Sequence, residues 1–511
     1  MEKLAPSPPA GAPRSWLSHV FPGRDVDIAR RAKYLSAQER HEHMGGVEQP
    51  ADVAAGAEDA APEHTDMSKV DRAVYEDVNG QYVEEVLPLP PTLGAVGAFW
   101  NMIAYSIALG ILSIPLVVAT IGIVPFILLT LLFAALTYYT GYSYWRLAMM
   151  YPGVHSLQQA GDLLFGPIGA TAFSIIQTVF SIFLQGNHAL LGGYAFWYLG
   201  WRDCMVGMVA VFSAVSFLFT LPRSYKVFSV QAAISFTSIF TVVIIAMIAS
   251  GVSGPTNKSP DDPPRRVLAF GATPQVPHNF LDGFLGVTNI FVSFGATPAY
   301  LPVIAEMKEP RHFKRSLATL VAVSTVMYAI VGCIMNYNLG QYTKSPSLGS
   351  LSTVMIKVSY GLALPTILVA GCASGQVSGK VLFLNFFSGR RRHLAKNRAL
   401  SWGVWIVINV ITWCLAFVLA EVIPFFSSFL GLESALFWSF FLALSAVFYF
   451  WRHQHDAWSS KRNRIGFLIA LAVFSIALVL MVAGTWAAAI SIRDEYRAGN
   501  VGSPFSCAMA A

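Results

Sequence analysis

The chain has 511 residues, of which 55% are hydrophobic and only 12% are charged, and its mean hydropathy is +0.55. Soluble proteins carry about 25% charged residues, so this composition, with apolar runs near or above about 18 residues, predicts a polytopic membrane protein. The net charge of +6 does not indicate a nucleic-acid partner, because the basic residues cluster in short loops between apolar runs. The sequence shows no metal-ligand spacing of its five cysteines, no Ser/His/Asp constellation and no nucleotide loop, so we expect neither an enzyme nor a bound metal or cofactor.

The first 92 residues differ in composition from the rest of the chain. Residues 1–92 are rich in Ala, Pro, Gly and charge, which predicts a mostly disordered tail on the cytosolic side. A membrane domain follows over residues 93–490, and we expect it to be all-α. Its apolar segments predict eleven transmembrane helices at roughly 93–120, 124–148, 168–199, 205–221, 227–251, 281–306, 316–339, 352–387, 401–420, 423–450 and 465–490.

The distribution of Lys and Arg predicts the orientation of these spans. With the N-terminus in the cytosol, the inner loops hold sixteen Lys and Arg residues and the outer segments hold seven. Cytoplasmic loops carry an excess of basic residues, so residues 491–511 are predicted to form a short extracellular tail. The polar segment from Tyr151 to Phe165 is amphipathic and is predicted to lie along the inner surface.

Two of the predicted spans contain helix-breaking residues. One runs from Asn101 through Gly110 to Pro115, and the other runs from Phe291 through Gly295 to Pro298. Backbone groups freed from a helix in hydrocarbon cost several kcal/mol each, so such breaks usually line a polar cavity. The breaks begin two oppositely oriented sets of five spans, 93–251 and 281–450, which predicts an inverted-repeat transporter with its site near the midplane.

The ends created by a break suit one class of ligand. A helix that stops and restarts exposes N–H groups, which favour a carboxylate, and C=O groups, which favour an ammonium group. An α-amino acid carries both groups close together. Neither break contains Asp, Glu, Lys or Arg, so we expect a net-neutral amino acid as the substrate.

Four motifs carry a resemblance to a known family. They are the Asn101…Gly110-Ile-Leu-Ser-Ile-Pro115 string, Leu221-Pro-Arg-Ser-Tyr-Lys226, Phe294…Glu306-Met-Lys-Glu-Pro310 and Ala420-Glu-Val-Ile-Pro-Phe-Phe426. Together they resemble the amino acid/auxin permease family, and within it the fungal neutral and aromatic amino-acid permeases. The resemblance implies the leucine-transporter-type fold, with five plus five inverted spans, spans 1 and 6 discontinuous, and one extra span at 465–490. It also implies uptake of amino acids, with protons as the coupling ion and large apolar or aromatic substrates favoured.

The resemblance also implies the residues that bind the substrate. Two positions depart from the family pattern: Ala108 stands where the family often has Gly, and Gly295-Ala-Thr297 stands where fungal members often have Ala-Gly-His. These departures leave the exact substrate open. The implied substrate-binding residues are Ser106, Ala108, Gly110, Ile111 and Leu112 of span 1 and Phe291, Ser293, Phe294, Gly295 and Ala296 of span 6.

Several polar side chains inside other spans are candidates for coupling. His188 in span 3 is interpreted as a proton relay or as a neutral ring bonded to a neighbouring span. Glu433 in span 10 is expected to carry the proton, to pair with a cationic substrate or to lie in an outer vestibule. Lys380 in span 8 is interpreted as a snorkelling lysine or as the occupant of a cation position, and the neighbouring hydroxyls of Ser374 and Ser378 as partners of water or a proton.

The inner end of span 6 is predicted to contain a gate. Glu306 lies beside Arg311 in the sequence, and we interpret the two as a gate salt bridge, with a solvated charge as the alternative.

The sequence therefore predicts a transporter of neutral amino acids, and the resemblance implies that it imports them by proton symport across the plasma membrane. The partners expected are the amino acid and the lipid bilayer. A vacuolar transporter or exporter and an amino-acid-sensing receptor without net flux are the alternatives, and the oligomeric state is left open.

Overall fold

A computed structural model of the chain describes residues 74–76, 82–84, 93–107, 110–222, 225–256, 258–259, 261–271, 279–386, 398–454, 457–499 and 504–507. Ala108 and most of the predicted tail lie outside the described residues. Within that tail, β1 (Val74–Glu76) pairs antiparallel with β2 (Tyr82–Glu84), a strand pair that the sequence did not predict.

The membrane part of the described chain consists of helices. Nine helical segments are long and apolar enough to cross a bilayer, and α8 (Met205–Thr220) is a shorter apolar helix of 16 residues. The first predicted span is divided into pieces that are each too short to count among the nine. With α8 and this divided span included, each of the eleven predicted spans has a helical counterpart. The long helices are α6 (Ile123–Met150), α7 (Leu157–Leu199), which is kinked at Gly166, α9 (Tyr225–Ser253), α12 (Phe313–Leu339), α13 (Thr353–Phe386), α15 (Arg398–Val422) and α18 (Lys461–Arg497).

Spans 1 and 6 are interrupted where the sequence predicts it. Span 1 consists of α4 (Ala95–Ser106), the 3₁₀ turn η1 (Gly110–Leu112) and α5 (Ile114–Ile121). Span 6 consists of α10 (Phe280–Ser293) and α11 (Thr297–Glu306). Each restarted helix has a proline in its first turn, a position where the missing N–H costs nothing because that N–H would have no intrahelical partner.

Span 10 is irregular as well, and the sequence did not predict this. It consists of α16 (Phe426–Glu433), the π-helical turn η5 (Ser434–Trp438) and α17 (Ser439–Arg452). Single π-helical turns inside α-helices frequently occur at functional sites.

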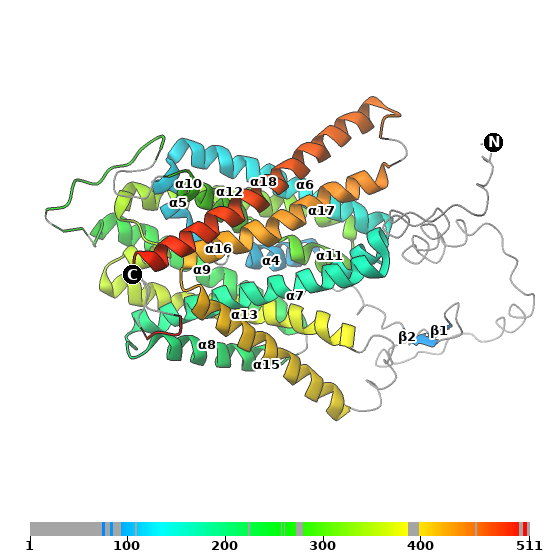
Figure 1. Cartoon of the computed structure of the whole chain (residues 1–511), viewed down its shortest axis with the longest axis horizontal. Coiled ribbons are helices and arrows are strands. Elements are labelled where there is room, and N and C mark those ends of the chain that lie inside the picture. Colours follow the sequence, from blue (N-terminus) through cyan, green and yellow to red (C-terminus); the bar gives the residue numbers. More distant parts are fainter. Residues whose placement is uncertain are drawn as a thin grey trace, which may run out of the picture.

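The irregular spans lie at the centre of the helix bundle. In the most apolar stretch of span 6, 83% of the residues are buried, and in that of span 10 the share is 72%, against 22% for α18. Figure 1 shows α18 running alongside α17 on the outside of the bundle, where its apolar side chains remain exposed for contact with lipid. Spans 6 and 10 therefore form the core and α18 is peripheral.

The segment predicted to lie along the inner surface forms the first turns of α7. Ser156 caps this helix by accepting a hydrogen bond from the N–H of Gln159, at 3.3 Å. The helix bends at Gly166, where φ is 72° and ψ is −156°. The bend brings Gly161 against Gly169, and a Cβ on Gly161 would lie 2.5 Å from the carbonyl oxygen of Gly169, so only a residue without a side chain fits this contact.

Candidate functional site

The breaks of spans 1 and 6 touch each other. A Cβ on Gly110 would lie 2.6 Å from the Cα atom of Ser293, so the backbones of the two spans approach each other at a distance that only glycine permits. The Ser106 hydroxyl donates a hydrogen bond to the carbonyl oxygen of Ser293 across the same crossing, at 3.1 Å. The two predicted breaks thus form a single structure.

A tyrosine of span 7 holds this crossing together. The hydroxyl of Tyr328 lies within hydrogen-bonding distance of two carbonyl oxygens, that of Ser106 at 3.0 Å and that of Ser293. The side chain is fully buried on α12. Sequence reasoning missed Tyr328, because an isolated tyrosine in an apolar span is usually an interface or packing residue.

The carbonyl groups at the end of α10 are only partly available to a ligand. The Phe291 carbonyl accepts the N–H of Phe294 at 3.2 Å, and the Val292 carbonyl accepts the N–H of Gly295 at 2.9 Å. The Phe294 carbonyl would pair with residue 298 in a continuing helix, but Pro298 has no N–H. The break therefore leaves an acceptor beside the crossing where an ammonium group could bind.

A cavity lies beside the crossing, between spans 1, 3, 5, 6, 8 and 10. Five of the predicted site residues line it: Ser106, Gly110, Gly295, His188 and Glu433. Its other lining residues are mostly apolar and were not predicted: Ala104, Tyr105, Leu184, Ala232, Ser235, Val292, Val369, Ala370, Ala373, Leu430 and Trp438.

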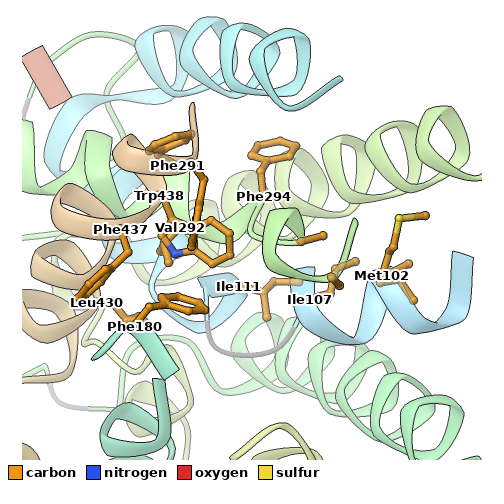
Figure 2. Close-up of a cluster of buried hydrophobic side chains, with 14 of the residues drawn as sticks. Met102, Ile107, Ile111, Phe180, Phe291, Val292, Phe294, Leu430, Phe437 and Trp438 are labelled. Carbon is orange, nitrogen blue, oxygen red and sulfur yellow. The ribbon is translucent and has the colours of Figure 1, made fainter. Parts of the chain in front are cut away.

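Six other predicted residues pack beside the cavity and do not line it. Phe291 stacks on Phe133, with ring centroids 5.0 Å apart, and Phe294 meets Tyr328 edge to face at 5.2 Å. Figure 2 shows the cluster of buried apolar side chains from spans 1, 3, 6 and 10 around the breaks. The six residues are Ile111, Leu112, Phe291, Ser293, Phe294 and Ala296, all of them buried.

Glu433 is a buried acid on the cavity wall. Its side chain has no exposed surface, and its Oε2 atom accepts a hydrogen bond from the amide of Asn187 on α7. Its Oε1 atom is also buried and has no partner within the described structure. One carboxyl oxygen therefore joins span 10 to span 3, and the other is an unpartnered acceptor of a residue on the cavity wall.

His188 lines the same cavity. Its Nδ1 atom lies 2.7 Å from the carbonyl oxygen of Leu184, and since a carbonyl only accepts, Nδ1 carries a hydrogen. The Nε2 atom is buried and has no partner among the described residues. In the neutral ring, Nε2 is then an unpartnered hydrogen-bond acceptor of a residue that lines the cavity together with Glu433.

Trp438 closes the cavity on the side of span 10. It is the last residue of the π-helical turn, and a Cβ on Gly295 would lie 2.5 Å from its Cζ2 atom. Its ring also meets that of Phe180 at 5.3 Å. The side chain of residue 295 is therefore limited by the tryptophan, but the sequence alone could not distinguish Trp438 from other packing aromatics.

The remaining coupling candidates on span 8 are not among the residues that line the cavity. The Ser374 hydroxyl donates to the carbonyl of Ala370, and the Ser378 hydroxyl donates to that of Gly375, both at 3.0 Å. Ser378 also accepts a hydrogen bond from Gln185 of α7, at 3.0 Å. Both hydroxyls therefore donate their hydrogen bond to a carbonyl group of their own helix.

The two gate candidates are not joined. Arg311 is exposed, and no ion pair between it and Glu306 occurs in the described part of the chain. The carboxylate of Glu306 interacts electrostatically with the ammonium group of Lys380 on α13 instead. The N–H of Leu93 donates a hydrogen bond to the carbonyl oxygen of Glu306 at 3.0 Å, and the carbonyl oxygen of Leu93 accepts one from the N–H of Lys308 at 2.9 Å.

The sequence of the chain is similar to those of known proteins. Residues 91–490 match the family described as transmembrane amino acid transporter protein. The "N amino acid transport system protein" of Neurospora crassa is 28% identical over 411 residues, which cover 80% of this chain and 86% of the relative. A "transmembrane transporter" of Gibberella moniliformis is 24% identical over 402 residues, covering 78% and 84%.

The fold also matches a solved structure. The crystal structure of MhsT in complex with L-phenylalanine superimposes with a TM-score of 0.50 and 14% identity, and the match covers 78% of this chain and 100% of MhsT. This likeness confirms the predicted leucine-transporter-type fold of a multi-span, all-helical membrane protein.

Proposed function

Because the chain belongs to the family of transmembrane amino acid transporter proteins, we propose that it imports neutral amino acids, chiefly large apolar or aromatic ones, by proton symport through alternating access. The observation that carries this proposal is the contact between the two broken spans at Gly110 and Ser293, beside a mostly apolar cavity. The breaks supply backbone groups for an amino-acid backbone and contain no charged side chain.

The proposed binding mode follows from the two kinds of helix end. The substrate carboxylate binds the N–H groups at the restart of span 1, at Gly110, Ile111 and Leu112, because helix N-termini favour anions. The substrate ammonium group binds at the end of α10, near the Phe294 carbonyl. The substrate side chain then faces the apolar part of the cavity wall, which includes Trp438.

The apolar character of this wall supports apolar or aromatic substrates. Leu184, Val292, Val369, Leu430 and Trp438 all contribute to it. The solved structure of MhsT contains phenylalanine, and the Neurospora relative is named as an amino acid transport protein. The first title agrees with an aromatic substrate, and the second name agrees with an amino acid as the substrate.

Two features favour the proton as the coupling ion. The cavity contains a carboxyl group, that of Glu433, which can take up and release one proton, and an imidazole, that of His188, with a free nitrogen. The hydroxyls of Ser374 and Ser378 on span 8 point their hydrogens at carbonyls of their own helix and lie off the cavity wall. The groups that can take up a proton therefore line the cavity, whereas these two hydroxyls do not.

The inner gate in this proposal includes Glu306 and Lys380. Their charges interact between α11 and α13, and the hydroxyl of the cavity residue Tyr105 also interacts with the Glu306 charge. The pairing of Leu93 with the backbone around Met307 ties the start of span 1 to the end of span 6. Opening of the inner side would separate these groups.

A disulfide supports the proposed orientation. Cys204, in the loop between α7 and α8, is bonded to Cys507 in the C-terminal tail. Disulfides persist in oxidising compartments and are rare in the cytosol, so this end of the bundle is proposed to face outside. The bias of basic residues toward the opposite end supports the same orientation. We propose the plasma membrane as the site of action and a vacuolar transporter as the alternative.

The test is uptake of labelled phenylalanine and leucine by cells that lack their own amino-acid permeases. Uptake is measured at two external pH values, each with and without sodium, and cells without the protein serve as the control. We expect accumulation against the gradient that increases at the lower pH and does not need sodium. Binding without accumulation would support a receptor, and sodium-dependent uptake would contradict proton coupling.

A further inference from the structure

We propose that the carboxyl group of Glu433 takes one positive charge in every transport cycle, and that this charge has two sources. When the substrate is a neutral amino acid, the charge is a proton. When the substrate is a basic amino acid, the charge is the ammonium or guanidinium group of its side chain, and no proton is carried. This inference rests on the proposed transport function and extends the substrate class to basic amino acids.

The first step of the argument is the isolation of the carboxyl group. Glu433 is the only Asp, Glu, Lys or Arg among the described residues that line the cavity. Its helix α16 packs against α7, α10, η5 and α18. Of the described titratable and charged side chains on these elements, His188 alone lines the cavity, and Tyr105 of α4 is the one other titratable group on the wall. The described surroundings therefore contain no fixed cation for Glu433.

The second step is the energetic consequence. An ionised carboxyl group that is fully buried without a partner charge costs several kcal/mol, and the neutral amide of Asn187 satisfies only one of its oxygens. The Oε1 atom is left without a partner. The negative charge of the carboxylate is neutralised when one positive charge joins it, either as a proton on the carboxyl group or as a cation that enters the cavity.

The third step is the geometry of the free acceptors. Two unpartnered buried acceptors belong to residues on the cavity wall, Oε1 of Glu433 and Nε2 of His188. Ammonium and guanidinium groups present several N–H donors, and their hydrogen bonds to a carboxylate are about twice as strong as neutral ones. The end of a basic side chain therefore matches these acceptors, while its methylene groups match the apolar wall.

The charge balance makes the inference testable. A neutral amino acid enters with one proton, and a basic amino acid enters with the charge that it already carries. The net charge moved per substrate is the same in both cases. The two substrates differ in driving force, because a proton gradient drives only the neutral one, whereas an inside-negative membrane potential drives both.

The experiment measures labelled phenylalanine and arginine uptake by the full-length protein, together with the current. We expect one charge per substrate molecule for both amino acids. At zero membrane potential, an inward proton gradient is expected to accumulate phenylalanine and not arginine. Glu433→Gln is expected to reduce arginine uptake by about tenfold or more. The phenylalanine uptake that remains in this variant is expected to carry no charge and not to depend on the proton gradient.

Two further variants control for folding and for charge. Glu433→Asp retains a carboxyl group and is expected to retain arginine uptake and proton-driven phenylalanine uptake. Glu421→Gln removes another buried carboxyl group, on α15 and away from the cavity wall, and is expected to behave as the unchanged protein. Thermal stability of each purified variant separates a misfolded protein from a specific loss.

Each contrary outcome contradicts either the inference about Glu433 or the proposed transport function. If the protein transports phenylalanine but arginine neither enters nor competes, the basic-substrate inference is wrong and the proposed function stands. If Glu433→Gln retains arginine uptake, or retains proton-driven phenylalanine uptake, Glu433 does not take the charge in that cycle. If neither amino acid is transported by the unchanged protein, the proposed function itself fails.

Discussion

Two single residues, Gly110 and Tyr328, determine how the broken spans 1 and 6 pack against each other at the centre of the bundle. At Gly110, the absence of a side chain permits the backbone of span 1 to touch that of span 6. At Tyr328, one hydroxyl serves two carbonyl groups that the breaks have freed. Both features place polar backbone deep in an apolar bundle, where an unsatisfied group is costly. Each can be tested by a substitution that changes little else.

Replacement of Gly110 by alanine tests the close approach of the breaks. The added Cβ would lie 2.6 Å from the Cα atom of Ser293, so the two spans must separate or shift. We expect a loss of about 1–3 kcal/mol in stability and a large loss of phenylalanine uptake. Gly207→Ala on α8, where no atom lies within 4 Å of the added Cβ, is the control and should not reduce either quantity. An active, stable Gly110→Ala protein would contradict the contact.

Replacement of Tyr328 by phenylalanine tests the hydroxyl that joins spans 1, 6 and 7. The carbonyls of Ser106 and Ser293 lose this donor, and we expect a loss of about 1–3 kcal/mol, measured by thermal unfolding. Uptake should decrease because the crossing loosens. Tyr337→Phe removes a hydroxyl at an exposed position of the same helix and is expected to have no effect. Equal effects of the two substitutions would contradict this role of Tyr328.

At the scale of helices, contacts between the ends of elements join span 1 to span 6 and span 6 to span 8. The start of α4 pairs with the end of α11 through Leu93 and Met307. The side chains of Glu306 and Lys380 interact between α11 and α13 at the same level. A transporter must make and break such contacts when it exchanges its open sides, so these ends are expected to control a rate more than a binding affinity.

The interaction between Glu306 and Lys380 can be measured with a double-mutant cycle. Glu306→Gln and Lys380→Met each leave a half-buried charge without this partner, and each should reduce stability and the maximal uptake rate. The double variant should lose less than the sum of the two, by about 0.5–3 kcal/mol in thermal stability. Arg311→Gln, combined with Glu306→Gln, is the control and should be additive because Arg311 is exposed and makes no ion pair with Glu306. Additivity in the Lys380 cycle would contradict the interaction.

At the scale of the whole molecule, one covalent bond connects distant parts of the chain. The disulfide between Cys204 and Cys507 spans 303 residues and ties the tail after α18 to the loop before α8. The N–H of Met205 also donates to the carbonyl oxygen of Cys507, at 3.2 Å. The ring of Phe505 in the same tail lies 6.1 Å from that of Phe417. The peripheral helix α18 and its tail are thereby fixed to the bundle at one end.

The disulfide provides a test of the proposed orientation. In a protein whose other cysteines, Cys333, Cys372 and Cys414, are replaced by serine, a thiol reagent that cannot cross membranes should label intact cells only after reduction. Omitting the reductant controls for free thiols. Permeabilised cells give the total signal. Labelling that requires permeabilisation would show that this end faces the cytosol, or that the protein resides in an internal membrane.

Much of the fold could be predicted from the sequence because its determinants are local. The apolar runs exceed what a soluble chain carries, and Gly110, Pro115, Gly295 and Pro298 interrupt helices through their own backbone chemistry. The third irregularity escaped prediction. The residues Ser434–Trp438 contain no helix breaker, so the π-helical turn there depends on packing against neighbouring helices and not on propensity.

The sequence by itself determined the class of this protein: a membrane-spanning bundle with two broken helices suited to a zwitterion. Only the tertiary structure decided which side chains surround the crossing. It brings Glu433 and His188 to one cavity, leaves Ser374 and Ser378 off its wall, adds Tyr328 and Trp438, and places Glu306 within electrostatic range of Lys380. The reason is physical. A helix break is a property of a few consecutive residues, whereas a cavity wall depends on which face each of six spans turns inward, and that is fixed only when the whole bundle packs.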